Sequence, residues 1–167
     1  IFRICLTGSD VQTDKGLPYI QICTLDAVRE TDIRAYDGVI TIEDSTIEEP
    51  FRIETDHPPQ RVIVFDDLTV PMDDYVLPEE RHVRSALRFA GQWEQPSLLI
   101  HCHVGMHRSP AIALAIFADW LGEGREEEAV QELLKVARLC TPNKLVVKIA
   151  DTVLGREGRL VEAIRTL

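Results

Sequence analysis

The residues best suited to chemistry are a cysteine and an arginine that stand in one short stretch. Cys102 and Arg108 are separated by five residues, with Gly105 midway between them. A cysteine thiolate is a strong nucleophile, and the planar guanidinium of arginine can hold two oxygens of a phosphate at once. The pair therefore predicts a loop that both binds a phosphoryl group and attacks it.

The segments on either side of this stretch predict a strand, a tight loop and a helix. A hydrophobic run, Leu98 to Ile100, precedes it, and an apolar segment, Ala111 to Ala118, follows. The N-terminus of a helix presents free backbone N–H groups and positive potential to an anion. Gly105 permits a turn that a side chain would obstruct. We therefore expect Cys102 to lie in a positively polarised loop and to be present largely as the thiolate.

The remainder of the chain alternates between predicted strands and predicted helices. Strands are predicted at Tyr19–Leu25, Gly38–Ile42, Arg61–Phe65 and Ser97–His101, and an additional edge strand at Phe2–Thr7. Helices are predicted at Glu79–Trp93, Glu126–Ala137, Val146–Leu154 and Leu160–Leu167, and along the apolar segment, with Ser109 as its N-cap and Pro110 as its first residue. The strand at Arg61–Phe65 is expected to be buried, and residues 43–60 are expected to form a surface loop. These elements predict an α/β fold: one domain, residues 1–167, with a central, mostly parallel sheet of four to five strands flanked by helices.

Charge and cysteine usage restrict the partners and the compartment. The net charge of −10 argues against binding to nucleic acid or to an anionic membrane surface. The longest fully apolar run has eight residues, Ala111 to Ala118, which is too short to span a membrane. The four cysteines, at positions 5, 23, 102 and 140, form no Cys-x-x-Cys pair. A reducing cytoplasm is therefore the expected location.

Three histidines lie close to the cysteine and invite two other interpretations. His101, Cys102, His103 and His107 could ligate a metal, but Arg108 would place a fixed positive charge beside the cation, so no metal is expected. A cysteine-protease dyad of His101 and Cys102 is disfavoured because adjacent residues at a strand end point to opposite sides. We instead expect His101 to hydrogen-bond the backbone of the loop and to order it.

The motif His101-Cys102-x-x-Gly105-x-x-Arg108-Ser109 resembles the signature of the cysteine-dependent protein tyrosine phosphatase superfamily, in its dual-specificity-like branch. The whole layout resembles a small bacterial group of tyrosine phosphatase-like proteins, and the likeness extends to the tail Leu154–Leu160. The resemblance implies a phosphotyrosine phosphatase-like fold and hydrolysis of phosphomonoesters without metal or cofactor. It implies a phosphorylated protein or a small phosphomonoester as substrate, with phosphotyrosine, and phosphoserine or phosphothreonine as well, as the substrate class.

The resemblance also implies roles for the residues of the motif. Cys102 would form a phosphocysteine intermediate, Ser109 would donate a hydrogen bond to its sulfur, and His101 would help to keep it ionised. The phosphate oxygens would be held by the Arg108 side chain and by the backbone N–H groups of the loop, which are those of His103, Val104, Gly105, Met106, His107 and Arg108.

The general acid, which must protonate the leaving oxygen, is assigned less directly. The family uses an aspartate on the loop that follows the strand ending at Phe65, and the position just after the strand selects Asp66 or Asp67. Likeness to the bacterial group favours Asp67, whereas no physical argument from the sequence separates the two. Asn143 resembles a residue that braces the phosphate loop in dual-specificity relatives, and it could equally be a helix N-cap.

Departures from the family pattern restrict the expected class of substrates, and other functions remain open as alternatives. The loop interior contains no lysine, which disfavours highly anionic phosphoinositides and RNA ends. The chain is too short for the added recognition loop of the large tyrosine-specific enzymes, so a shallower pocket is expected. A non-catalytic phosphate-binding module is the first alternative. A sulfur-transfer or arsenate-reducing enzyme is the second, although arsenate reduction would need further reactive cysteines.

Overall fold

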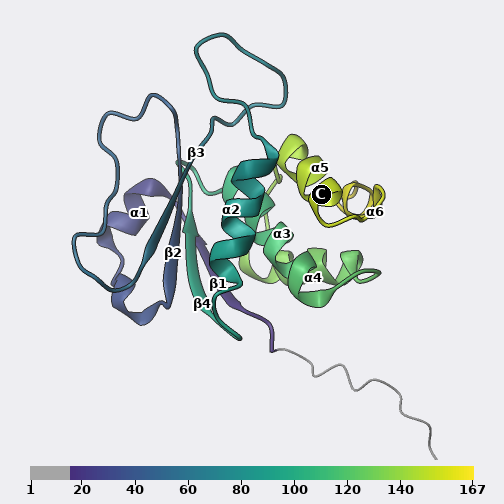
Figure 1. The fold of residues 1–167 in the computed structure, drawn as a ribbon, viewed down its shortest axis with the longest axis horizontal. Coiled ribbons are helices and arrows are strands. Elements are labelled where there is room, and N and C mark those ends of the chain that lie inside the picture. The colour runs from purple at the N-terminus through teal and green to yellow at the C-terminus, as the bar shows by residue number, and fades with distance from the viewer. Residues whose placement is uncertain (1–15) are drawn as a thin grey trace, which may run out of the picture.

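The computed structural model describes residues 16–167 and shows an α/β fold built on a parallel sheet (Figure 1). Its four strands are β1 (Tyr19–Cys23), β2 (Gly38–Glu43), β3 (Gln60–Val64) and β4 (Ser97–His101), in the order β1-β4-β2-β3. All three strand pairings are parallel. The predicted parallel sheet is confirmed with four strands, and the expected strand at Phe2–Thr7 lies outside the described residues.

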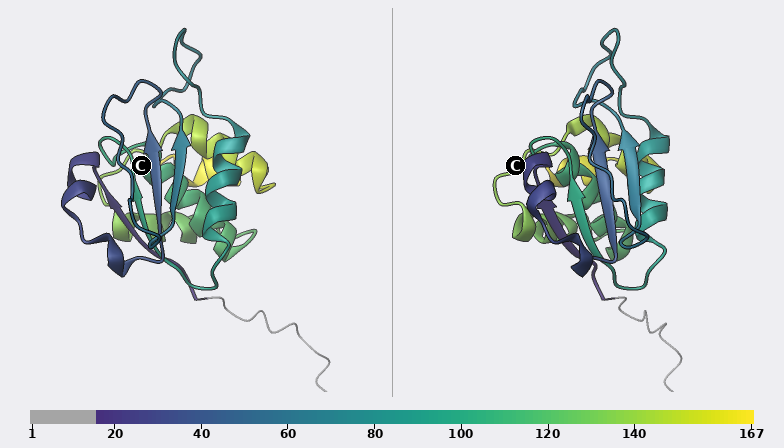
Figure 2. Two further views of the ribbon diagram at one scale, coloured as in Figure 1. Left: turned by 60° about the vertical axis from the view of Figure 1, so that its left-hand side comes forward. Right: turned by 90° about the vertical axis from the view of Figure 1, so that its left-hand side faces the viewer.

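Helices cover both faces of this sheet, as Figures 1 and 2 show. They are α1 (Leu25–Glu30), α2 (Glu80–Ala90), α3 (Arg108–Leu121), α4 (Glu126–Val136), α5 (Lys144–Val153) and α6 (Arg159–Ala163), with a short 3-10 helix at Ile33–Ala35. The larger hydrophobic core joins the sheet to α2–α6, and a smaller core joins its other face to α1. Leu98, Leu99 and Ile100 of β4 are fully buried because both faces of the strand are covered.

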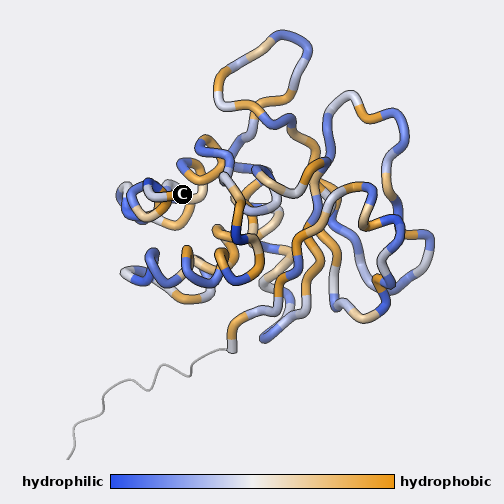
Figure 3. Tube along the Cα trace, turned by 180° about the vertical axis from the view of Figure 1, so that it is seen from behind, coloured by the Kyte–Doolittle hydropathy of each residue, from blue (hydrophilic) through white to orange (hydrophobic). Residues whose placement is uncertain are grey.

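Helix α3 lies at the centre of the larger core. Every residue from Ala111 to Ala118 is buried, as the uniformly apolar sequence predicts. In Figure 3 hydrophobic residues gather along the strands in the middle of the molecule, whereas the loops around them are mixed, with many hydrophilic residues. The start of α3 differs from the expectation, because the helix begins at Arg108 and its N-cap is His107. The prediction of Ser109 as N-cap is therefore wrong by two residues, and Pro110 is the third helical residue. Pro110 is tolerated there because the first N–H groups of a helix have no acceptor within it.

Two other expectations need correction. Strand β3 is an edge strand of the sheet, so it is only partly buried and Val64 is exposed. The loop between β2 and β3 is not purely a surface loop, because Phe51 and Ile53 pack against the smaller core. Arg52 holds it there through two hydrogen bonds of 2.8 Å to the buried carboxylate of Glu43.

A buried arginine of the C-terminal tail joins two helices of the helical layer. Arg156 is buried and donates to the carbonyl oxygen of Ala118 at 3.0 Å and to the carboxylate of Glu126 at 3.2 Å. The tail therefore joins the end of α3 to the first turn of α4. Within residues 16–167, no helix has the length and the apolar character that crossing a membrane requires.

Candidate active site

The loop from Cys102 to His107, called the phosphate loop here after the ligand that the sequence predicts for it, leaves the carboxyl end of β4 and enters α3, as expected. The backbone N–H of Gly105 donates to the Cys102 sulfur at 3.2 Å, so the loop curls around the buried thiol. Gly105 adopts a φ of +79°, and a Cβ there would lie 3.0 Å from the carbonyl oxygen of Cys23. The N–H of Leu25 donates to the carbonyl of His103 at 3.0 Å. The end of β1 and the start of α1 thus support the loop from outside, and any residue other than glycine at position 105 would be strained.

Arg108 is buried in the first turn of α3 and is oriented by two acceptors from other parts of the chain. Its Nη1 lies 2.8 Å from the carbonyl oxygen of Phe65 and 2.8 Å from Oδ1 of Asp44. Asp44 directly follows β2, so it lies at the same carboxyl edge of the sheet as Cys102. The sequence analysis missed Asp44, although its position at a strand end, where such sheets bind ligands, was a usable signal.

Two buried polar atoms at the end of the loop have no hydrogen-bond partner among the described residues. They are Nε of Arg108 and Oγ of Ser109. Buried polar groups are normally satisfied, so an N–H and an O–H in this position are suited to a bound oxyanion and to the sulfur beside it. The structure places no hydrogen bond between Ser109 and Cys102.

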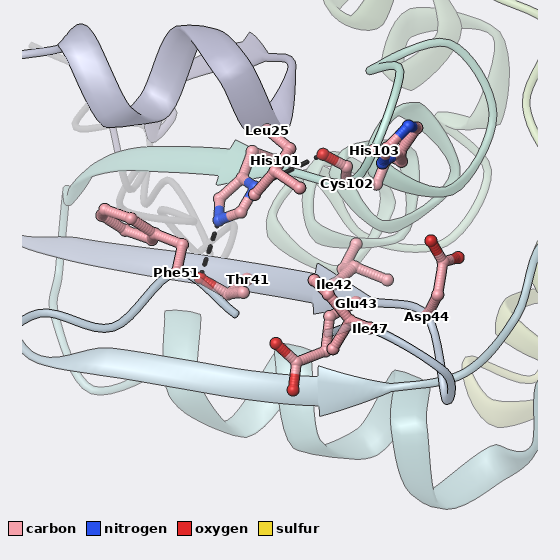
Figure 4. Close-up of a pocket in the computed structure, with 10 residues that line it drawn as sticks. All are labelled: Leu25, Thr41, Ile42, Glu43, Asp44, Ile47, Phe51, His101, Cys102 and His103. Atoms are coloured by element: carbon pink, nitrogen blue, oxygen red, sulfur yellow. Dashed lines mark hydrogen bonds between the residues drawn. The ribbon is translucent and has the colours of Figure 1, made fainter. Parts of the chain in front are cut away.

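His101 lies beneath the loop in a buried network, which Figure 4 shows together with a small pocket. Its Nε2 is 2.8 Å from Oγ1 of Thr41, and its Nδ1 is 3.4 Å from the carbonyl oxygen of Cys102. Gln60 donates to Thr41 at 2.8 Å. Burial lowers the pKa of His101 to about 4, so the ring is neutral at pH 7. The expected hydrogen bond to the loop backbone is present, and Thr41, which the sequence analysis did not identify, holds the other ring nitrogen.

The pocket lies between the ends of β2 and β4 and the start of the phosphate loop. Its lining residues are Leu25, Thr41, Ile42, Glu43, Asp44, Ile47, Phe51, His101, Cys102 and His103. The ring of Phe51 meets that of His101 edge to face, with 5.5 Å between centroids. The β2–β3 loop therefore closes over His101 and shields it from water.

Asp66 and Asp67 are adjacent in sequence but have different surroundings. Asp66 is buried and accepts hydrogen bonds from the Ser45 N–H at 3.0 Å, the Ser45 hydroxyl at 2.6 Å and the Val76 N–H at 2.7 Å. Burial by itself would raise the pKa of Asp66, but these hydrogen bonds and the charge of Arg108 outweigh it, so the pKa lies below its usual value. Asp66 is therefore an ionised residue that ties loops together.

Asp67 instead contacts the phosphate loop. Its Oδ2 is 2.6 Å from Nδ1 of His107, and its Oδ1 accepts from Nδ2 of Asn143 at 2.8 Å. About a third of the Asp67 side chain is exposed, at 34%. The carboxyl group of Asp67 is thus accessible at the edge of the loop that contains Cys102.

Asn143 joins three segments at this point. Its Oδ1 caps α5 by accepting from the N–H groups of Leu145 and Val146. Its Nδ2 donates to Asp67 and to the carbonyl of Leu68, and its backbone N–H donates to the carbonyl of His107 at 3.0 Å. Asn143 is therefore the N-cap of α5 through Oδ1, contacts the phosphate loop through its backbone N–H, and reaches the aspartate loop through Nδ2.

The other cysteines and histidines of residues 16–167 provide no metal site. Burial, and then the proximity of Cys102, raise the pKa of Cys23 to about 11, which keeps it a thiol. Cys23, Cys102 and Cys140 are free cysteines. Across residues 16–167, His, Cys, Asp and Glu side chains gather in no group of three or more that could hold a metal ion.

A parallel sheet with a cysteine loop between its central strand and a buried helix defines the fold class. It is the fold of the cysteine-based, dual-specificity-like tyrosine phosphatases, as predicted. Tk-PTP in its active form matches with a TM-score of 0.58 and 19% identity, over 84% of this chain and 93% of its own. DUSP15 matches with a TM-score of 0.55 and 14% identity, over 90% of this chain and 92% of its own. No protein-family model and no curated protein sequence matches the chain.

Proposed function

We propose that this chain is a cysteine-dependent, metal-independent phosphomonoesterase that acts on phosphoproteins, on phosphotyrosine and also on phosphoserine or phosphothreonine. One observation carries the proposal: the Cys102 sulfur lies at the centre of a loop that curls around it, with the buried Arg108 guanidinium at the loop's end. The fold agrees with this assignment.

The first step is attack of the Cys102 thiolate on phosphorus. The S–P bond forms as the P–O bond to the leaving group breaks, which produces a phosphocysteine. The Arg108 guanidinium and the backbone N–H groups of residues 103–108 hold the other phosphate oxygens as their charge changes. Asp44 and the carbonyl of Phe65 keep the guanidinium in place.

Asp67 is the proton donor in this scheme. An acid must be able to hold a proton and reach the leaving oxygen, and Asp67 is partly exposed beside the phosphate loop. Asp66 is less suitable, because three donors and the nearby Arg108 favour its ionised form. In the second step water attacks phosphorus, the S–P bond breaks and Asp67 takes a proton from the water. The hydroxyl of Ser109 then stabilises the released thiolate.

The surface around the loop supports a peptide as substrate. Nine large hydrophobic residues are exposed within the described chain, and six of them lie on three loops: the phosphate loop, the β3–α2 loop that begins with Asp66 and Asp67, and the segment between α4 and α5. These six are Val70, Met72, Tyr75, Val104, Met106 and Leu139. Leu139 belongs to the segment whose Thr141 N–H donates to the carbonyl of Met106. An apolar surface of this kind suits the side chains that flank a phosphorylated residue. A reducing compartment such as the cytoplasm suits the free Cys102 thiol.

Replacement of the nucleophile tests the proposal. Cys102→Ser is expected to lower turnover of an aryl phosphate by at least about 10³-fold, because the weak hydroxyl nucleophile cannot form the covalent intermediate efficiently. Orthovanadate is expected to bind both proteins and to inhibit the native one. The measurement is release of inorganic phosphate, with vanadate affinity as the control for an intact loop. Near-native activity of the variant would refute the mechanism. Vanadate binding by a native protein without turnover would identify a non-catalytic phosphate-binding module.

A further inference from the structure

His107 is a phosphate-loop residue whose side chain the proposed mechanism does not use. It is the N-cap of α3, and its ring is 47% exposed. Its Nδ1 lies 2.6 Å from Oδ2 of Asp67, which is forty residues earlier in the chain. The other exposed histidine of the loop, His103, has no hydrogen bond to its side chain in the described part of the structure. Of these two exposed histidines of the phosphate loop, His107 is therefore the one whose side chain is hydrogen-bonded to another part of the chain.

The contact is a hydrogen bond between two groups that can each donate or accept. Either Nδ1–H of the ring donates to the Asp67 carboxylate, or a protonated Asp67 donates to Nδ1. In both arrangements one proton lies between Nδ1 and Oδ2, which are 2.6 Å apart, and the ring directs the carboxyl group.

The contact closes a ring of three residues that joins separate segments. Asn143 donates from Nδ2 to the other oxygen of Asp67 and from its backbone N–H to the carbonyl of His107. The phosphate loop, the loop with Asp67 and the start of α5 thus meet at His107, Asp67 and Asn143. Each of the two Asp67 oxygens has one side-chain partner, so the direction of the carboxyl group is determined on both sides.

We propose that His107 is a positioning residue that holds the carboxyl group of Asp67 against the phosphate loop, where it can reach the leaving oxygen. The inference rests on the proposed function, in which Asp67 is the proton donor. His107 gains and loses no proton over the full cycle, because Asp67 gives one proton to the leaving group and recovers one from water. Its contribution is therefore geometric and acts only through Asp67.

A pair of variants separates the hydrogen bond from the bulk of the ring. His107→Phe keeps a planar ring and removes the nitrogen, whereas His107→Asn keeps a short polar group near the position of Nδ1. Two substrates report on the acid: phenyl phosphate, whose leaving group needs a proton, and an aryl phosphate with a strongly acidic phenol, whose leaving group does not. His107→Phe is expected to lower kcat for phenyl phosphate by roughly 10- to 100-fold, as for loss of a hydrogen bond to a charged group, and to leave the second substrate within about 2-fold. His107→Asn is expected to recover part of the loss.

Combining the variants tests whether His107 affects turnover through Asp67. In an Asp67→Asn background, His107→Phe is expected to cause no further loss on phenyl phosphate, because both changes remove the same step. His103→Ala, in the same loop, is expected to change both substrates by the same factor. Thermal unfolding and vanadate affinity control for a damaged fold.

The outcomes separate this inference from the function on which it rests. If His107→Phe slows both substrates equally, or adds its full loss to that of Asp67→Asn, His107 does not act through Asp67 and the inference is wrong. If the native protein hydrolyses neither substrate, the proposed function itself fails. If the native protein is active but Asp67→Asn affects both substrates alike, the assignment of Asp67 fails and His107 loses its proposed role with it.

Discussion

The phosphate loop and the loop with the two aspartates border the same site, but they differ in how much of their structure comes from contacts within the loop itself. The phosphate loop is one continuous stretch, and the hydrogen bond that curls it around the thiol joins Cys102 to Gly105, three residues apart. The aspartate loop is held by partners from distant parts of the chain: Ser45 and Val76 for Asp66, and His107 and Asn143 for Asp67. The turn around the proposed nucleophile therefore contains a short-range contact, with β1 and α1 supporting it from outside, whereas every side-chain partner of the proposed proton donor comes from a distant segment.

The contrast extends to the two histidines beside the site. His101, under the phosphate loop, is fully buried and neutral, with Thr41 and the Cys102 carbonyl as its partners. His107, at the end of the loop, is half exposed and faces a carboxylate. One histidine supports the backbone of the loop, and the other, in our proposal, directs the acid.

The largest effect is expected when Asp67 and Asp66 are substituted one at a time and their kinetics are compared. Asp67→Asn is expected to lower kcat for phenyl phosphate by about 10²- to 10⁴-fold, since general acid catalysis contributes that much, with a far smaller effect on a substrate whose leaving group needs no proton. Asp66→Asn is the matched control in the same loop. It places an amide N–H among three donors, so it should lower the free energy of unfolding by about 1–3 kcal/mol without this leaving-group dependence. The reverse pattern would assign the acid to Asp66.

The next effect concerns pH and the buried His101. The pKa of this histidine falls from 6.5 to about 4 on folding, so the unfolded chain binds more protons between these values. Stability is therefore fully present above pH 6.5 and is lost as the pH falls towards 4, by on the order of 3 kcal/mol. The pH-dependent contribution of His101 to the free energy of unfolding is measured by urea unfolding of the native protein and of His101→Asn at pH 7.5 and 4.5. An equal pH dependence in both proteins would contradict the buried neutral ring.

A smaller effect tests whether the contact between Gly105 and the end of β1 shapes the phosphate loop. In Gly105→Ala the new Cβ would be in a backbone conformation with positive φ and close to the Cys23 carbonyl. The conformation alone should lower the free energy of unfolding by about 1–2 kcal/mol. The contact with Cys23 should also weaken vanadate binding. Gly155 is a matched control, because its φ is +66° and nothing lies within 4 Å of an added Cβ. Gly155→Ala should show the backbone strain alone and bind vanadate normally. Equal vanadate affinity in both variants would show that contact with β1 does not shape the loop.

The smallest effect divides the two roles of Asn143. Asn143→Ala should lose the N-cap of α5, at about 1 kcal/mol, and the hydrogen bond to Asp67. Asn143→Asp keeps a capping oxygen and places a second carboxyl group opposite Asp67. It should therefore unfold close to the native denaturant midpoint and yet turn over phenyl phosphate more slowly. If both variants show native kinetics, the contact with Asp67 does not position the acid.

Several features of the fold were predictable because their determinants are local. The alternation of apolar runs and polar segments places β2 and β4 within one or two residues of their ends, and the apolar run from Ala111 identifies a central helix. Other features depend on neighbours that the pattern does not contain. The apolar run of β3 predicts a buried strand, but the strand order leaves it at an edge. Ser109 is a favourable N-cap residue, but the loop brings Arg108 into the helix before it.

The candidate site divides in the same way. The sequence by itself predicted a strand, a loop and a helix around the proposed nucleophile, because Cys102, Gly105 and Arg108 lie within seven consecutive residues, where chain connectivity limits their arrangement. Tertiary structure alone decided which adjacent aspartate faces that loop, that Asp44 orients Arg108, and that His107 contacts Asp67. Neighbouring residues in a loop point in different directions, and the contacts that choose between them come from strands and helices tens of residues away. Packing, rather than residue spacing, therefore determines where the proposed proton donor lies.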